Sequence, residues 1–250
     1  MKLFLTLLMV CGLAHAKNIE LTTDNHVLLR NEINDTSISK LQVELAQKVI
    51  KRGTKSYTIY LVLDSPGGSI DSGLNFIEFA KTIPNLETVS LFAASMASAI
   101  VEALPGQRNV LETGILMFHR ARGGVSGQFE DGELESRLNA YKKMVRDMET
   151  VNAKRLGISI DVYKSKVKDE LWVTGKDAVS AKAADATVSI TCAADVINRT
   201  TIETFEFMGM QFDVKFNACA LVKAGSVVQP ENMLKYQQFK AEQLNMRSSK

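Results

Sequence analysis

Apolar runs and amphipathic stretches alternate along the first half of the chain. Tyr57 to Leu63 is a nearly continuous apolar run, as in a strand buried on both faces, and a second run begins at Leu86 and leads into Ser95. Apolar residues at helical spacing occupy 38–49 and 69–81. This order predicts an α/β fold with parallel strands joined by right-handed crossovers, in which sites form at the carboxyl ends of strands.

Weaker patterns predict further elements on both sides of this region. They are one or two edge strands within 19–33, two short strands at Val110 and 115–118, a short helix over 159–170, an extended piece over 171–173, a helix over 175–184 and a strand over 187–190. The core domain is therefore expected to cover residues 17–195.

A long amphipathic helix is predicted from Asp131 to Leu156. Its apolar face carries Leu134, Leu138, Tyr141, Met148 and Val151, with Lys and Arg on the opposite face. At more than about six turns, such a helix is long enough to project from the domain and mediate oligomerisation.

The C-terminal part follows a different period. Phe205, Phe207, Phe212, Val214 and Phe216 alternate around Met208-Gly209, which predicts a β-hairpin within an extension over 196–228. Residues 229–250 form a polar tail to which we assign no chemistry.

The first sixteen residues have the features of a secretory signal peptide. Lys2 precedes an apolar stretch, and Ala14-His15-Ala16 resembles a small-x-small cleavage site, so we expect residues 1–16 to be removed and the protein to be periplasmic or secreted. Lys and Arg total 30 against 28 Asp and Glu, a balance that indicates no nucleic-acid partner.

Two cysteines remain after removal of that leader, Cys192 and Cys219. In an oxidising compartment they are expected to form a disulfide that closes a loop of about 28 residues, worth roughly 3 to 4 kcal/mol in the chain-entropy model. The alternative is a pair of buried free thiols.

Ser95 lies where an apolar strand gives way to small residues and a helix begins. A hydroxyl at this turn would have the N–H groups of Ser95 and Met96 beside it, unpaired at the helix start, which suits a nucleophile. The alternative is that Ser95 only caps a helix packed against a sheet.

Four short motifs in register resemble the Clp-type serine peptidases of the crotonase-like superfamily. They are Ser65-Pro66-Gly67-Gly68, Ala94-Ser95-Met96-Ala97, Phe118-His119 with Gly123-Gly124, and Asp177-Ala178-Val179. The resemblance extends from about Val27 to Ser189 and implies a twisted, mainly parallel sheet of repeated ββα units. It also implies a long projecting helix that mediates contacts between rings, where 131–156 lies.

The same resemblance assigns roles to individual residues. It makes Ser95 the nucleophile and His119 the general base. The N–H groups of Gly68 and Met96 would form the oxyanion hole. The residues implied to lie along the substrate backbone are Gly67, Gly123 and Gly124.

The resemblance leaves the acidic partner of His119 open. Counting back from Asp177 without gaps places it at Glu170, which we favour, while an Asp stands one position earlier at Asp169. If both are surface acids paired with Lys166 or Lys168, a Ser–His dyad remains.

The function implied is an exported serine endopeptidase that cleaves peptides or unfolded proteins as a ring-shaped homo-oligomer. We expect no metal or cofactor and, outside the cytoplasm, no ATP-driven unfoldase partner. A Ser–Lys peptidase resembling the signal peptide peptidases is an alternative, with Lys142, Lys143 or Lys154 as base, but it leaves His119 unexplained. A non-catalytic oligomeric scaffold and a crotonase-type acyl-thioester lyase are further alternatives.

Overall fold

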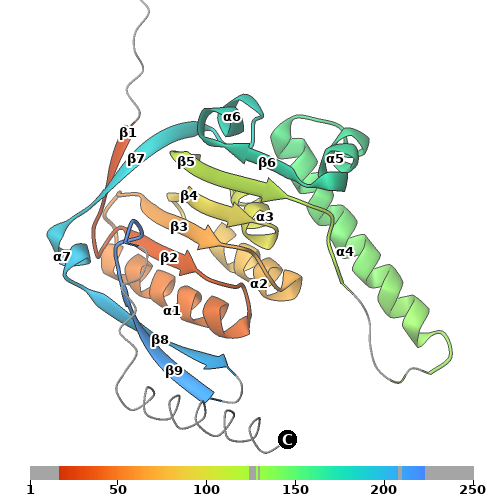
Figure 1. The fold of residues 1–250 in the computed structure, drawn as a ribbon, viewed down its shortest axis with the longest axis horizontal. Coiled ribbons are helices and arrows are strands. Elements are labelled where there is room, and N and C mark those ends of the chain that lie inside the picture. Colours follow the sequence, from red (N-terminus) through yellow and green to blue (C-terminus); the bar gives the residue numbers. More distant parts are fainter. Residues whose placement is uncertain (1–16, 124–127, 129, 208–209, 223–250) are drawn as a thin grey trace, which may run out of the picture.

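The computed structural model describes residues 17–123, 128, 130–207 and 210–222 (Figure 1). The expected signal peptide, the polar tail and Gly124 lie outside these residues. No helix in the described ranges is long and apolar enough to cross a membrane.

A seven-stranded sheet organises the fold and confirms the predicted α/β class. Its order is β1 (Lys17–Leu21), β7 (Ala186–Cys192), β5 (Arg108–Phe118), β4 (Leu86–Ala94), β3 (Ile59–Ser65) and β2 (His26–Arg30), all parallel, while β6 (Leu171–Thr174) pairs antiparallel with β5. The two short strands expected at Val110 and 115–118 form one continuous strand, β5. Its first half pairs with β7 and its second half pairs with β6.

Helices connect the strands. They are α1 (Asp35–Arg52), α2 (Ile70–Lys81), α3 (Met96–Ala103), α4 (Glu133–Leu156), α5 (Ile160–Lys166), the 3-10 turn η1 (Val167–Asp169), α6 (Gly175–Ser180) and α7 (Ala194–Ile197). The main hydrophobic core lies between the sheet and the helices, and includes Leu45, Leu63, Phe76 and Ile100. The helix expected over 175–184 ends at Ser180, since the N–H groups of Ala183 and Ala184 turn back to the Ala178 carbonyl.

The edge strands β1 and β2 are neighbours in the sequence but stand at opposite ends of the strand order. A second, smaller core explains this arrangement, because Ile19 and Leu21 of β1 pack with Tyr60 and Val62 of β3. The second core thus joins residues of β1 and β3 with Ala220, which follows the hairpin.

Helix α4 projects from the domain in its first half (Figure 1). Leu134 and Leu138, predicted for its apolar face, are 46% and 37% exposed, whereas Asn152 and Leu156 near the other end are 3% exposed. Only the last turns of α4 contribute to the core.

The C-terminal hairpin is formed by β8 (Thr200–Phe207) and β9 (Met210–Asn217), paired antiparallel as predicted. The disulfide between Cys192 and Cys219 is present and joins the end of β7 to the chain that follows the hairpin. Arg30 of β2 holds the same segment, since its guanidinium donates to the Ala220 carbonyl at 3.1 Å.

Candidate active site

Ser95 occupies a sharp turn between β4 and α3. Its φ of 55° is unusual for a residue with a side chain, and such strain persists where the surrounding structure imposes it. The hydroxyl makes no cap hydrogen bond to α3. Instead, Ser95 Oγ lies 2.6 Å from Nε2 of His119, which directly follows β5. The parallel pairing of β4 with β5 brings these two strand ends together.

The N–H groups around this turn differ in their availability. The expectation that the Ser95 N–H is unpaired is wrong, because it donates to the Met117 carbonyl at 2.9 Å. The Ser98 hydroxyl lies 2.7 Å from the carbonyl oxygens of both Ser95 and Met117 and braces the turn. Met96 is the first residue of α3, so its N–H has no acceptor within the helix.

Gly68 presents a second N–H to the same region. Ile33 N donates to the Gly67 carbonyl and Ser69 N donates to the Ile33 carbonyl, each at 2.8 Å. Because N–H groups alternate in direction along an extended segment, the Gly68 N–H points away from Ile33, toward the cleft that Gly68 lines. The structure thus provides two backbone donors near Ser95, from Gly68 and Met96.

Gly67 packs beneath the turn and is not among the described residues that line the cleft. A Cβ at this position would lie 2.6 Å from the Ala94 oxygen, 2.7 Å from Ser95 Cβ and 2.8 Å from Met96 N. Only glycine permits this approach, so Gly67 sets the position of the turn.

His119 is half-buried, and its pKa is lowered from the usual 6.5. Desolvation is the main cause; the positive charge of Arg122 lowers the pKa further, while the negative charge of Glu170 opposes both. A neutral imidazole can accept a proton from Ser95 near neutral pH. Its other nitrogen, Nδ1, is buried, and among the described residues no carboxylate is hydrogen-bonded to it.

Of the two candidate acids, Glu170 is the one whose charge acts on His119. Its carboxylate is bound elsewhere: Oε2 accepts a hydrogen bond from Trp172 Nε1 at 3.0 Å, and Oε1 lies 3.6 Å from the Arg122 guanidinium. Asp169 is exposed and is not among the groups that shift His119. The charge of Glu170 therefore acts on the histidine, but no hydrogen bond joins the two side chains.

The cleft beside Ser95 has a volume of about 200 Å³. Apolar side chains form most of its wall, including Ile70, Phe118 and Met148. Asn152 and Tyr163 also line it, and neither was predicted from the sequence as a site residue. The only sequence signal that could have indicated this part of the site is Asn152, an amide near the end of the long amphipathic helix.

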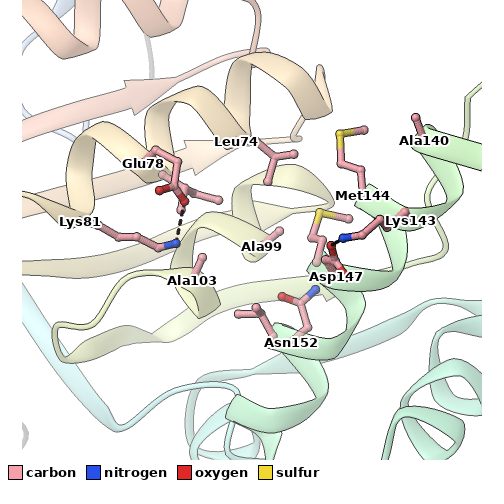
Figure 2. A pocket seen from close by; sticks show the side chains of 13 residues that line it. Leu74, Glu78, Lys81, Ala99, Ala103, Ala140, Lys143, Met144, Asp147 and Asn152 are labelled. Atoms are coloured by element: carbon pink, nitrogen blue, oxygen red, sulfur yellow. Dashed lines mark hydrogen bonds and ion pairs between the residues drawn. The ribbon is translucent and has the colours of Figure 1, made fainter. Parts of the chain in front are cut away.

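A second, larger cavity of about 440 Å³ adjoins the cleft (Figure 2). Leu74 of α2, Ala99 and Ala103 of α3, and Met144 of α4 line it, with ion pairs Glu78–Lys81 and Lys143–Asp147 among its walls. The two cavities share three residues, Ala99, Met148 and Asn152. They are therefore adjacent spaces between α3 and α4.

The remaining predicted residues lie around the site or outside it. Gly123 packs against the Tyr141 ring of α4, since a Cβ there would approach the Tyr141 hydroxyl. Lys142, Lys143 and Lys154 are exposed, and among the described residues the Ser95 hydroxyl bonds to His119 and to none of them. No three His, Cys, Asp or Glu side chains come together as a metal site within the described ranges.

Comparison with known proteins adds to this geometry. The family described as Clp protease matches residues 15–191 of the chain. An ATP-dependent Clp protease proteolytic subunit of Bacteroides fragilis is 30% identical over 161 residues, covering 63% of this chain and 76% of that protein. The proteolytic subunit 1 of Borreliella burgdorferi is 27% identical over 157 residues, covering 61% of this chain and 78% of that protein.

Proposed function

The chain belongs to the Clp protease family, and on that premise we propose that it is a serine peptidase with Ser95 as nucleophile and His119 as general base. The observation that carries the proposal is the 2.6 Å contact between Ser95 Oγ and His119 Nε2. A hydroxyl that only capped α3 would bond to the helix backbone, which the Ser95 hydroxyl does not do.

The reaction would proceed in two steps through an acyl-enzyme. His119 Nε2 accepts the Ser95 proton as Oγ attacks the substrate carbonyl, and the oxyanion accepts hydrogen bonds from the N–H groups of Gly68 and Met96. His119 then protonates the leaving amine, and the C–N bond breaks. In the second step His119 accepts a proton from the water that attacks the ester, and it returns this proton to Ser95 Oγ as the acid product leaves.

Glu170 is the acid that we assign to His119, as a positioning residue. Its charge favours the imidazolium that forms when Ser95 loses its proton. Glu170→Gln should therefore lower kcat/KM, whereas Asp169→Asn should not, because Asp169 is exposed. Equal losses in the two variants would contradict this assignment, and unchanged kcat/KM in Glu170→Gln would support a Ser–His dyad.

We further propose that the protein acts outside the cytoplasm, on peptides or already unfolded chains. The signal-like residues 1–16 and the disulfide between Cys192 and Cys219 support export. The exposed Leu134 and Leu138 on the projecting half of α4 support assembly with further copies of the chain. The oligomer would act without an ATP-driven partner.

Labelling with a fluorophosphonate tests the nucleophile directly. The intact mass of the wild-type protein should increase by one adduct, and Ser95→Ala and His119→Ala should show none. Ser136→Ala is a matched control, because Ser136 is an exposed serine on α4, and it should label like the wild type.

Two outcomes would reject this proposal. If the assembled wild-type oligomer is not labelled, Ser95 is not activated and a non-catalytic scaffold becomes the better explanation. If His119→Ala is still labelled while a lysine variant is not, the base is a lysine. Size-exclusion chromatography of the same samples establishes whether the oligomer has formed.

A further inference from the structure

Two buried polar side chains lie in the otherwise largely apolar cleft beside Ser95. Asn152 of α4 and Tyr163 of α5 are 3% and 2% exposed, and Asn152 Nδ2 donates to the Tyr163 hydroxyl at 3.0 Å. Figure 2 shows Asn152 on the side of α4 that faces α3. This pair gives a polar region to the same cleft that Ser95 lines.

The hydrogen bonds of this pair are incomplete. Asn152 Oδ1 is buried and has no hydrogen-bond partner in the described part of the chain. A buried acceptor without a donor is unfavourable, and a ligand that supplies the donor recovers that free energy. Burial also raises the pKa of Tyr163 to about 12, so its hydroxyl keeps its proton and can donate to an acceptor.

We propose that Asn152 and Tyr163 select a neutral side-chain amide, that of glutamine, at the substrate residue whose carbonyl Ser95 attacks. The inference rests on the proposed peptidase function. The glutamine N–H would donate to Asn152 Oδ1, and its carbonyl would accept from the Tyr163 hydroxyl. The aliphatic part of the side chain would pack against Ile70 and Met148, which line the same cleft.

The charges around the cleft favour a neutral group over a charged one. Among the described residues that line it, Arg122 carries the only permanent charge, and a substrate lysine or arginine would be repelled by it. A glutamate would place a carboxylate against the Asn152 oxygen, which has no proton to donate. Methionine has a similar length but leaves that oxygen without a donor.

Matched fluorogenic peptides test the proposal. They differ only in the residue before the cleaved bond, which is glutamine, glutamate or methionine, and a further peptide carries glutamine after that bond. With the wild-type protein, kcat/KM for glutamine should exceed that for methionine by about 10- to 100-fold. Glutamine on the other side of the bond should give no such advantage.

Substitution of Asn152 should remove this preference. Asn152→Leu should lower kcat/KM for the glutamine peptide and bring it to or below that for methionine. Asn139→Leu is the matched control, because Asn139 is exposed on the same helix, and it should keep the wild-type ratio. The wild-type comparison needs no variant, so misfolding of Asn152→Leu would not remove the test.

A binding measurement separates this inference from the proposed function. The product peptides ending in glutamine or methionine are titrated calorimetrically into the Ser95→Ala protein, where the dissociation constant for glutamine should be about tenfold lower or better. If fluorophosphonate labels the wild type but neither binding nor cleavage favours glutamine, this inference is wrong and the peptidase proposal stands. If labelling fails while binding still favours glutamine through Asn152, the peptidase proposal is wrong and the amide site stands. Preference for glutamate would assign selectivity to Arg122 and overturn the inference.

Discussion

Gly67→Ala should impair the candidate peptidase through the position of Ser95, without removing any reacting group. The added Cβ would meet the Ala94 oxygen, Ser95 Cβ and Met96 N at 2.6, 2.7 and 2.8 Å. These contacts are with backbone and with the nucleophile's own Cβ, so no flexible side chain can move away to relieve them. The turn itself must shift.

The magnitude has two parts. Alanine at a φ of +93° costs roughly 1 to 2 kcal/mol, and overpacking at a site that cannot relax adds about 1 to 3 kcal/mol. The free energy of unfolding should therefore fall by about 2 to 5 kcal/mol. A displacement of Ser95 by about 1 Å should lower the rate of reaction by on the order of 100-fold.

Gly132→Ala is the matched control for backbone strain. Gly132 has a φ of +76°, but no described atom lies within 4 Å of the position of a Cβ. It should lose only about 1 to 2 kcal/mol of stability and keep the wild-type rate. Urea denaturation gives the stability of both variants, and the second-order rate constant for fluorophosphonate labelling gives the reactivity of Ser95.

Labelling of both alanine variants at the wild-type rate would refute this reasoning. In that case other parts of the chain would shift to relieve the close contacts at Gly67, and the turn would not depend on glycine for its position. Loss of labelling in Gly132→Ala as well would assign the effect to general destabilisation. The expected result is a loss confined to Gly67→Ala.

The remaining predictions concern the charges around His119 and the disulfide. Because the base must be neutral, kcat/KM rises with pH through the pKa of His119. Removing the positive charge of Arg122 raises that pKa, so Arg122→Gln should move the rise in kcat/KM to higher pH. Removing the negative charge of Glu170 lowers it, so Glu170→Gln should move the rise to lower pH. Shifts of the two profiles in the same direction would contradict the charge assignment. Replacing both Cys192 and Cys219 with serine should lower the free energy of unfolding by roughly 3 to 4 kcal/mol in urea, and a loss below about 1 kcal/mol would show that the closed loop is not what stabilises the segment.

Much of the fold and the Ser95–His119 pair could be predicted from the sequence. Apolar periodicity over Tyr57 to Leu63 and over 69–81 reflects which faces are buried, and burial determines strand and helix locally. Alternation of these elements implies parallel strands, whose carboxyl ends lie at one edge. Ser95 and His119 each follow such a strand, and these two strands, β4 and β5, pair in the sheet.

Other features of the site depend on tertiary contacts. The Ser95 N–H donates to the Met117 carbonyl on the neighbouring strand. The Glu170 carboxylate is bound by Trp172 and Arg122 and forms no hydrogen bond with His119. These pairings depend on strand register and on side-chain rotamers, which local periodicity does not encode.

The sequence by itself determined the element types, which follow from burial patterns. It also determined the candidate nucleophile and base, which follow from the motifs that resemble those of the Clp-type serine peptidases. The tertiary structure alone decided that β1 and β2 stand at opposite ends of the strand order, and that Asn152 meets Tyr163 beside the serine. Both depend on how separate elements pack, since a buried polar pair forms only where two helices place their side chains together. The polar part of the cleft is therefore a property of the packed fold.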